Sequence, residues 1–332
     1  MMKILYVSPL ANACTYYRCT LPARHLRKRG LAETRVVSGI AKEYVDWADL
    51  VVVQRVVGDL ICHVVRYCKL EGKKVVYELD DNIFKYPDSV EYVRKGLQAE
   101  TLSALRITRS VDAITTSTDA IAETVRELVD TPVYVLPNQI DFADIERMNF
   151  SARKQLSVGW AGGHYHVQDL GLVEQALESV LQKYPEVVLI MYGACPKGLY
   201  ERENTRVFLQ PFMPIEEFHF WMASFRFDVG IAPLYKTEFA RSRSNLRLLQ
   251  YAAMKIPIVA SNYGEYGKAL CNGLAGITAE DDQWVETISR LIECPEERTQ
   301  LGEAAYGYVR ENYDIEKGVD RWSTAYGEVL AR

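Results

Sequence analysis

Short apolar runs alternate with longer amphipathic segments along the first half of the chain. The runs are apolar at consecutive positions rather than at every second one, and they stand at 3–8, 34–37, 50–54, 74–78, 113–116 and 132–136. Segments between them carry apolar residues at helical spacing, as at 59–70 and 91–109. Strands buried on both faces and joined by helices are typical of parallel sheets, so the pattern predicts a doubly wound α/β domain.

The same alternation resumes in the second half of the chain. Strand-like runs are expected at 156–161, 187–192, 206–209, 228–234 and 258–260, with helices at 169–183, 216–223, 282–293 and from 296 onward. Residues 137–157 lie between the two series and combine turn-forming residues with a charged stretch, which is typical of a linker. We therefore predict two domains, 1–145 and 155–310, followed by a helical tail at 311–332.

The segment 228–263 combines a strand, an arginine-rich loop and a helix in that order. Ser244 stands where an N-cap is expected, and Pro257 ends the helix. Free N–H groups and the positive end of the helix dipole favour an anion at such a helix start. Arg243 and Arg247 lie near that end, where cations are unfavourable unless an anion is present. The pattern therefore predicts a phosphate site, against the alternative of an ordinary βαβ unit with solvated arginines.

Composition narrows the classes of function. The chain has 332 residues with a formal charge of −5, and without a long basic run a general nucleic-acid binder is not expected. Seven cysteines without a C-x-x-C pair indicate a reducing compartment, and no stretch resembles a signal peptide or a membrane span. The turn at 8–18 contains no glycine, which argues against an NAD or FAD fingerprint.

We expect a cytoplasmic protein whose contact with a membrane is at most peripheral. The basic cluster at 24–29 is interpreted as a solvated helix face. Its alternative interpretation is a docking surface for an anionic acceptor or for a membrane.

Three stretches carry a resemblance to a known family. LPNQID at 136–141 is similar to a PNG-(I/V)-D run at a domain junction, and SVGWAGGHYHVQDL at 157–170 is similar to a first strand with its glycine loop. DVGIAPLYKTEFARSRSNLRLLQYAAMKIPIVAS at 228–261 is similar to a donor-binding core. Together they resemble glycosyltransferase family four, whose members have the GT-B fold and use nucleotide sugars. The resemblance covers nearly the whole chain and is strongest from 157 to 265.

The resemblance implies two Rossmann-like domains that face a central cleft, with the C-terminal helix packing back toward the first domain. It implies a retaining transfer of a sugar from a nucleotide-diphosphate sugar, of UDP or GDP type, to a hydroxyl acceptor such as a glycan or a lipid-linked sugar. Neither a tightly bound cofactor nor a metal is expected, and the net acidity argues against a nucleic-acid acceptor.

The donor site is expected on the loop after the first strand of the second domain and at the start of the arginine-rich helix. Its predicted residues are Gly162, Gly163, Arg241, Arg243, Ser244, Asn245, Arg247 and Gln250. Arg243, Arg247 and Gln250 are expected to share one helix face with Tyr251. Arg241 is equally well explained as a solvated loop residue.

The predicted catalytic residues are Asp80, Asp81 and His164. The two aspartates close a strand of the first domain, at the edge where such folds bind ligands, and one of them is expected to orient or deprotonate the acceptor. The alternative, with equal weight, is that LDDN simply forms a turn. Tyr16, Tyr17 and Arg18 replace the family's N-terminal glycine loop and are expected to contact the acceptor or the phosphate, with Tyr17 and Arg18 predicted to bind the acceptor.

Three departures from the family pattern bear on activity. Ser242 and Gln250 stand where the family has two glutamates, and Lys255 stands where it has a glycine. Gln250 keeps an acceptor carbonyl but loses the charge, and a lysine in place of that glycine implies a different or strained turn. A non-catalytic nucleotide-sugar or glycan binder, or a nucleotide-sugar epimerase, therefore stays open as an alternative function.

Overall fold

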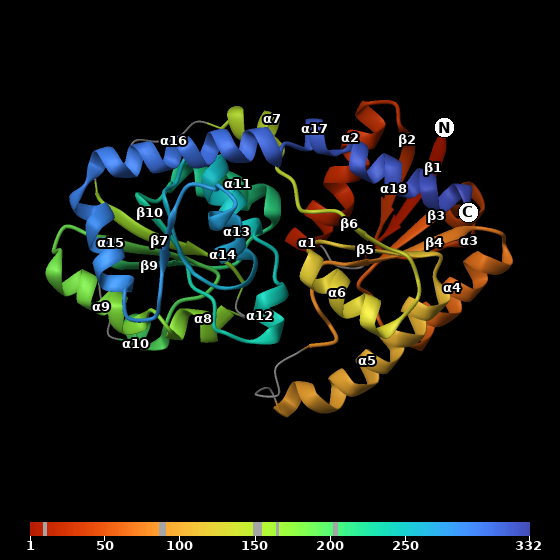
Figure 1. The fold of residues 1–332 in the computed structure, drawn as a ribbon, viewed down its shortest axis with the longest axis horizontal. Helices are drawn as coiled ribbons and strands as arrows, with labels where there is room; N and C mark the ends of the chain where they lie inside the picture. The colour runs from red at the N-terminus through yellow and green to blue at the C-terminus, as the bar shows by residue number, and fades with distance from the viewer. Residues whose placement is uncertain (9–11, 86–90, 149–154, 164–165, 202–204) are drawn as a thin grey trace. The chain divides into compact units, whose positions relative to one another are not determined.

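The computed structural model describes residues 1–8, 12–85, 91–148, 155–163, 166–201 and 205–332. These residues form two compact units, each built on one parallel sheet of six described strands (Figure 1). The first unit comprises Met1–Gln139, Thr237–Ser244 and Ile315–Arg332, and the second comprises Ile140–Lys236 and Asn245–Asp314. The predicted doubly wound α/β fold is confirmed.

The first sheet has the strand order β2-β1-β3-β4-β5-β6. Its strands are β1 (Met2–Val7), β2 (Ala32–Val37), β3 (Leu50–Gln54), β4 (Lys74–Leu79), β5 (Ala113–Thr116) and β6 (Val133–Val135). The helices of this unit are α1 (Ala13–Thr15), the π-helix η1 (Tyr16–Thr20), α2 (Leu21–Lys28), α3 (Lys42–Trp47), α4 (Asp59–Leu70), α5 (Glu91–Ser110), α6 (Asp119–Leu128), α12 (Glu238–Ser242), α17 (Ile315–Gly318) and α18 (Asp320–Ala331). Helices α2 and α18 cover one face of the sheet, and α4, α5 and α6 cover the other (Figure 1).

The second sheet has the strand order β12-β11-β10-β7-β8-β9. Its strands are β7 (Ser157–Ala161), β8 (Val188–Tyr192), β9 (Val207–Gln210), β10 (Val229–Ala232), β11 (Ile258–Ser261) and β12 (Ile277–Ala279). The helices of this unit are α7 (Phe142–Glu146), α8 (Val167–Gly171), α9 (Glu174–Lys183), α10 (Lys197–Glu201), α11 (Ile215–Ser224), α13 (Leu246–Ala253), α14 (Gly264–Cys271), α15 (Trp284–Glu293) and α16 (Pro295–Asn312). Side chains of α9 and α15 form the core on one face of this sheet.

Several helices differ from the sequence prediction. The stretch expected as a polar loop contains α12, because Thr237 caps it by accepting a hydrogen bond from the N–H of Ala240 at 3.0 Å. The single helix expected at 169–183 is two helices, α8 and α9. Strand β12 and helix α14 were not predicted. None of the described helices is both long enough and apolar enough to cross a membrane.

The turn after α13 is strained at the position where the sequence departs from the family pattern. Lys255 has φ 56°, in the left-handed region that glycine adopts without cost. Its ammonium group pairs with Glu303 of α16 at 2.8 Å. The expectation of a strained turn at Lys255 is confirmed.

Candidate functional site

The second sheet reverses its winding between β7 and β10. The chain runs from β7 to β8 and β9 on one side, and then returns to place β10 on the other side of β7. In parallel α/β sheets, ligands bind outside the carboxyl ends of the strands at such a point. Here these ends carry Ala161, the two glycines that follow it, and Ala232. This edge of the second sheet is the candidate donor site.

Arg247 is held at this edge from the first turn of α13 and is only 7% exposed. Its Nε donates to the carbonyl of Ala161 at 2.8 Å, and its Nη1 donates to the hydroxyl of Tyr266 at 3.1 Å. The guanidinium lies 4.8 Å from the centroid of the Trp160 ring. Within the described ranges, no carboxylate lies at ion-pair distance from Arg247. Because a buried charge is costly without a counter-charge, this position favours an anion.

Two other arginines of the second unit also bond to carbonyl groups, but at the opposite ends of helices. Arg206 donates to the carbonyl of Leu181 at 2.7 Å, and Arg298 donates to that of Leu291 at 2.6 Å. These carbonyls lie in the last turns of α9 and α15, where the helix dipole is negative. Arg247 instead stands at the positive end of its own helix, so the dipole adds to the need for an anion.

The two glycines after β7, Gly162 and Gly163, differ in what a side chain at each position would contact. A Cβ at Gly162 would lie 2.5 Å from Nη2 of Arg247 and 2.7 Å from the ring of Trp160, so Gly162 makes room for the guanidinium. A Cβ at Gly163 would meet no atom of the described residues within 4 Å, its chain neighbours aside. None of the described side chains therefore covers the backbone of Gly163 on that side.

The start of α13 differs from the prediction. Asn245, not Ser244, is the N-cap residue, and its side chain makes no capping hydrogen bond. Ser244 lies one residue before the N-cap, and its Oγ accepts a hydrogen bond from Nδ2 of Asn138 at 2.9 Å. Arg243 ends α12 with an extended ψ of 139°, so it does not share a face with Arg247 on α13 as expected. The uncapped N–H groups of α13 remain suited to an anion.

For the remaining residues, the structure gives no hydrogen bond among the described residues to the carboxyl ends of β7 and β10. Arg241 is exposed and pairs with Glu238 at 3.3 Å. Gln250 is half-buried. Ser242 is buried, and its hydroxyl donates to the carbonyl of Phe239 at 2.9 Å, so it is used within α12.

His164 lies outside the described residues, but a second histidine stands close by. His166 Nδ1 is 2.6 Å from Oδ2 of Asp169, and Oδ1 of Asp169 accepts from the N–H of Tyr235 at 2.8 Å. The pair thus joins the segment after β7 to the segment after β10. The sequence analysis predicted only His164 and missed His166 with its partner. The signal was the spacing of His and Asp three residues apart at a helix start.

In the first unit, Asp80 and Asp81 follow β4 and share one arginine. Arg55 Nε is 3.3 Å from Oδ1 of Asp80, and its Nη1 forms an ion pair with Asp81. Burial and the charge of Asp80 raise the pKa of Asp81, while the guanidinium groups of Arg55 and Arg243 oppose that shift. Arg55 itself has φ 36°, and such strain in a non-glycine residue is concentrated at functional sites.

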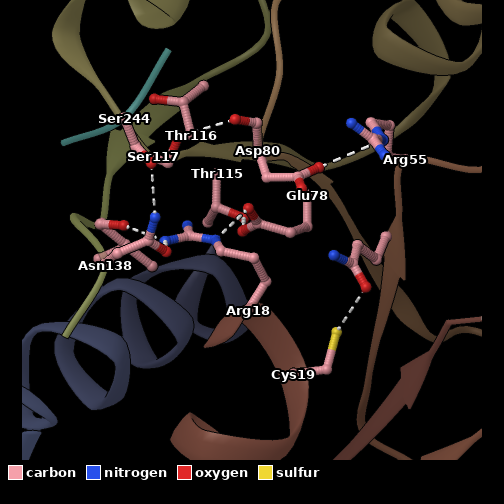
Figure 2. Close-up of polar contacts among 12 residues, drawn as sticks. Arg18, Cys19, Arg55, Glu78, Asp80, Thr115, Thr116, Ser117, Asn138 and Ser244 are labelled. Carbon is pink, nitrogen blue, oxygen red and sulfur yellow. Dashed lines mark hydrogen bonds and ion pairs between the residues drawn. The ribbon is translucent and has the colours of Figure 1, made fainter. Parts of the chain in front are cut away.

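The predicted acceptor residues Tyr17 and Arg18 are both buried in the first unit, and their contact with an acceptor stays a prediction. Arg18 Nε donates to Oε1 of Glu78 at 2.7 Å (Figure 2). Its Nη1 donates to the carbonyl of Leu136 at 2.6 Å and to Oδ1 of Asn138 at 3.0 Å. Burial raises the pKa of Glu78, and the Arg18 charge opposes the shift.

Comparison with known proteins agrees with this architecture. Residues 173–323 match the family model described as glycosyl transferase-like. No curated protein matches the chain in sequence.

Solved structures define the fold. Sucrose-phosphate synthase from Thermosynechococcus elongatus has a TM-score of 0.73 and 12% identity, with 100% of both chains covered. A glycosyltransferase from Rickettsia africae has a TM-score of 0.69 and 12% identity, covering 99% of this chain and 98% of that one. Anabaena HepE, in complex with UDP and glucose, has a TM-score of 0.66 and 15% identity, covering 98% of this chain and 100% of its own. The chain therefore has the GT-B fold and contains a glycosyltransferase-like domain.

Proposed function

We propose that the protein is a metal-independent, retaining glycosyltransferase that moves a sugar from a nucleoside-diphosphate sugar to a hydroxyl acceptor. The observation that carries the proposal is Arg247, a buried guanidinium at the positive end of a helix with only neutral described partners. A diphosphate oxygen would supply the missing counter-charge. UDP is the favoured nucleotide, since HepE was solved with UDP, and GDP is the alternative to be tested.

In this reaction the bond between the anomeric carbon and the diphosphate breaks, and negative charge builds on the leaving oxygen. Fixed cations and aimed N–H groups stabilise that charge without moving during the reaction. Arg247 would supply the fixed cation, with Arg243 as the second. The open backbone at Gly163 and the uncapped start of α13 at Asn245 would supply N–H groups. The loss of one such contact costs about 2–4 kcal/mol in the barrier.

The acceptor side of the proposal rests on Asp81 and its neighbours. Asp81 is 31% exposed at its side chain, so it could meet an acceptor hydroxyl, and its raised pKa suits a group that accepts a proton. Arg55, which also pairs with Asp80, would hold Asp81 in place. His164 keeps its proposed role as a further catalytic residue beside the glycines.

The test is a calorimetric titration with UDP, GDP and their sugar conjugates, with and without magnesium, followed by a transfer and hydrolysis assay. We expect metal-independent binding of one diphosphate series and strong loss of both binding and turnover in Arg247→Ala and Arg243→Ala. Arg226→Ala, which changes an exposed arginine of the second unit, is the control and should behave as wild type. Full activity in both arginine variants would contradict the proposal.

A non-catalytic binder is the second candidate function, and Ser242 is the observation that favours it. Its hydroxyl is used inside α12, so it cannot stand in for the glutamate that the family pattern has at this position. Diphosphate binding without any hydrolysis or transfer of the matching nucleotide sugar would favour the binder over the transferase.

A further inference from the structure

A buried chain of hydrogen bonds crosses the carboxyl edge of the first sheet and ends at Ser244 (Figure 2). It begins at Glu78, which is 0% exposed and accepts hydrogen bonds from Arg18 and from the hydroxyl of Thr115. Arg18 then donates to the side-chain carbonyl of Asn138, whose amide nitrogen donates to Ser244. Replacing an ion pair as buried as this one by apolar residues of equal volume is often neutral or stabilising, so its burial is weak evidence that it serves stability.

Arg18 fixes the direction of the hydrogen bonds that lead from it through Asn138 to Ser244. A guanidinium has only donors, so the side chain of Asn138 must turn its oxygen toward Arg18 and its NH₂ toward Ser244. The side-chain carbonyl and NH₂ of an asparagine cannot otherwise be told apart by shape. Because Asn138 is only 4% exposed, its side-chain amide cannot turn toward solvent instead. Ser244 Oγ is therefore obliged to accept.

A serine hydroxyl that accepts from Asn138 keeps its own proton for another partner. Ser244 is half-buried and directly precedes Asn245, the N-cap residue of α13, whose side chain makes no capping hydrogen bond. Over the described ranges, no acceptor for the Ser244 proton lies within hydrogen-bond distance. We infer that Arg18 and Asn138 are positioning residues that make Ser244 a hydrogen-bond donor to a phosphate oxygen of the nucleotide. This inference rests on the proposed function.

The competing explanation is that the chain merely anchors the segment Thr237–Ser244 to its unit. A second anchor allows the two explanations to be separated. The hydroxyl of Thr118 donates to the carbonyl of Ser242 at 3.0 Å, which holds the same segment but leaves the direction of the Ser244 hydrogen bond unchanged. Thr118→Val removes this anchor at nearly constant volume, together with the N-cap hydrogen bond that the hydroxyl accepts from the N–H of Ile121 in α6.

The decisive variant is Asn138→Asp, measured at pH 8 so that the new carboxyl is ionised beside Arg18. It keeps the size of the side chain but replaces the donor toward Ser244 by an acceptor. The Ser244 proton must then point at the introduced carboxylate rather than at a ligand. The probes are UDP and uridine, or GDP and guanosine if the wild-type protein binds the guanine series, and the affinities are measured by calorimetry.

We expect Asn138→Asp and Ser244→Ala each to weaken diphosphate binding roughly tenfold, the scale of one hydrogen bond to a charged group. Nucleoside binding should be unchanged, and the double variant should lose no more than either single one. Thr118→Val should melt at a lower temperature than wild type with diphosphate affinity intact.

Three results would overturn the inference. They are an Asn138→Asp protein with wild-type diphosphate affinity, a loss that is equal for nucleoside and diphosphate, and a Thr118→Val loss as large as that of Asn138→Asp. A wild-type protein that binds neither diphosphate contradicts the proposed function instead, so the two failures are distinguishable.

Discussion

Arg247 and Tyr251, one turn apart on α13, bind the backbone carbonyl and the backbone N–H of Ala161 at the end of β7. The Nε of Arg247 donates to the carbonyl of Ala161 at 2.8 Å, and the hydroxyl of Tyr251 accepts from the N–H of Ala161 at 2.9 Å. The same hydroxyl donates to the carbonyl of Ile231 in β10 at 3.3 Å. Regular pairing of β7 with β10 involves only Val158–Val229 and Gly159–Gly230, so Tyr251 bridges the two strands just beyond it.

Tyr251→Phe should destabilise the second unit and disturb the donor edge at once. The substitution leaves the N–H of Ala161 and the carbonyl of Ile231 buried without this partner, which costs about 1–3 kcal/mol. Urea unfolding followed by fluorescence measures the loss. Diphosphate affinity should also fall, because the carbonyl that orients Arg247 belongs to the freed residue. Unchanged stability would show that neither group depends on Tyr251.

Gly162 and Gly163 offer a matched pair of alanine substitutions. The new methyl group of Gly163→Ala meets no atom of the described residues, so the free energy of unfolding should stay within about 0.5 kcal/mol of wild type. If the donor approaches this backbone, the new methyl group should still reduce diphosphate affinity, as measured by calorimetry. Gly162→Ala places Cβ 2.5 Å from the Arg247 guanidinium and should reduce stability and affinity together. Wild-type affinity in Gly163→Ala would mean that the ligand does not contact this glycine.

The fold was predictable because its strands are buried on both faces. The runs at 50–54 and 113–116 coincide with β3 and β5. Elements whose stability comes from local capping or from packing were missed. Helix α12 depends on one capping threonine within a polar stretch, and β12 is only three residues long, with a single fully buried position. Neither leaves a periodic pattern long enough to recognise.

The sequence predicted which residue types form the candidate site, but not which contacts each residue makes. A run of arginines before a helix indicates an anion site, yet only the structure separates Arg241, paired with a glutamate, from Arg247, buried against neutral groups. Arg18 was expected to face an acceptor, but its partner Glu78 is sixty residues away in the chain. Long-range ion pairs of this kind leave no local signal in a single sequence.

Two glycines of α16 test how the strained turn at Lys255 is held. A Cβ at Gly302 would lie 2.3 Å from the carbonyl oxygen of Lys255, and backbone cannot give way as a side chain can. Gly302→Ala should therefore cost about 1–3 kcal/mol. Gly307, in the same helix, is exposed and would have no atom near its Cβ, so Gly307→Ala should stabilise by about 0.5–1 kcal/mol through helix propensity. Thermal unfolding of the two variants side by side measures the contrast, and equal effects would refute it.

The pH dependence of transfer should report on Asp81. Burial and the neighbouring Asp80 raise the pKa of Asp81 above the ordinary value of about 3.9, and Arg55 and Arg243 work against that shift. If the ionised carboxylate accepts the acceptor proton, kcat/KM should fall as the pH drops through this raised pKa. The acid limb should therefore begin at a higher pH than for an unperturbed aspartate.

Arg243→Gln removes a charge that lowers the pKa of Asp81, so the acid limb of its residual activity should move to higher pH. Asp81→Asn should be nearly inactive and lack the limb. The raised pKa also makes the stability of the fold depend on pH. A carboxyl whose pKa is raised on folding contributes stability that is complete below its unfolded pKa. That contribution is lost as the pH rises through the pKa of the folded state. Asp81→Asn should therefore lose less stability than wild type between acid and neutral pH. The measurements are kcat/KM and the urea midpoint of unfolding, each as a function of pH. If the acid limb of kcat/KM does not move in Arg243→Gln, a group other than Asp81 titrates.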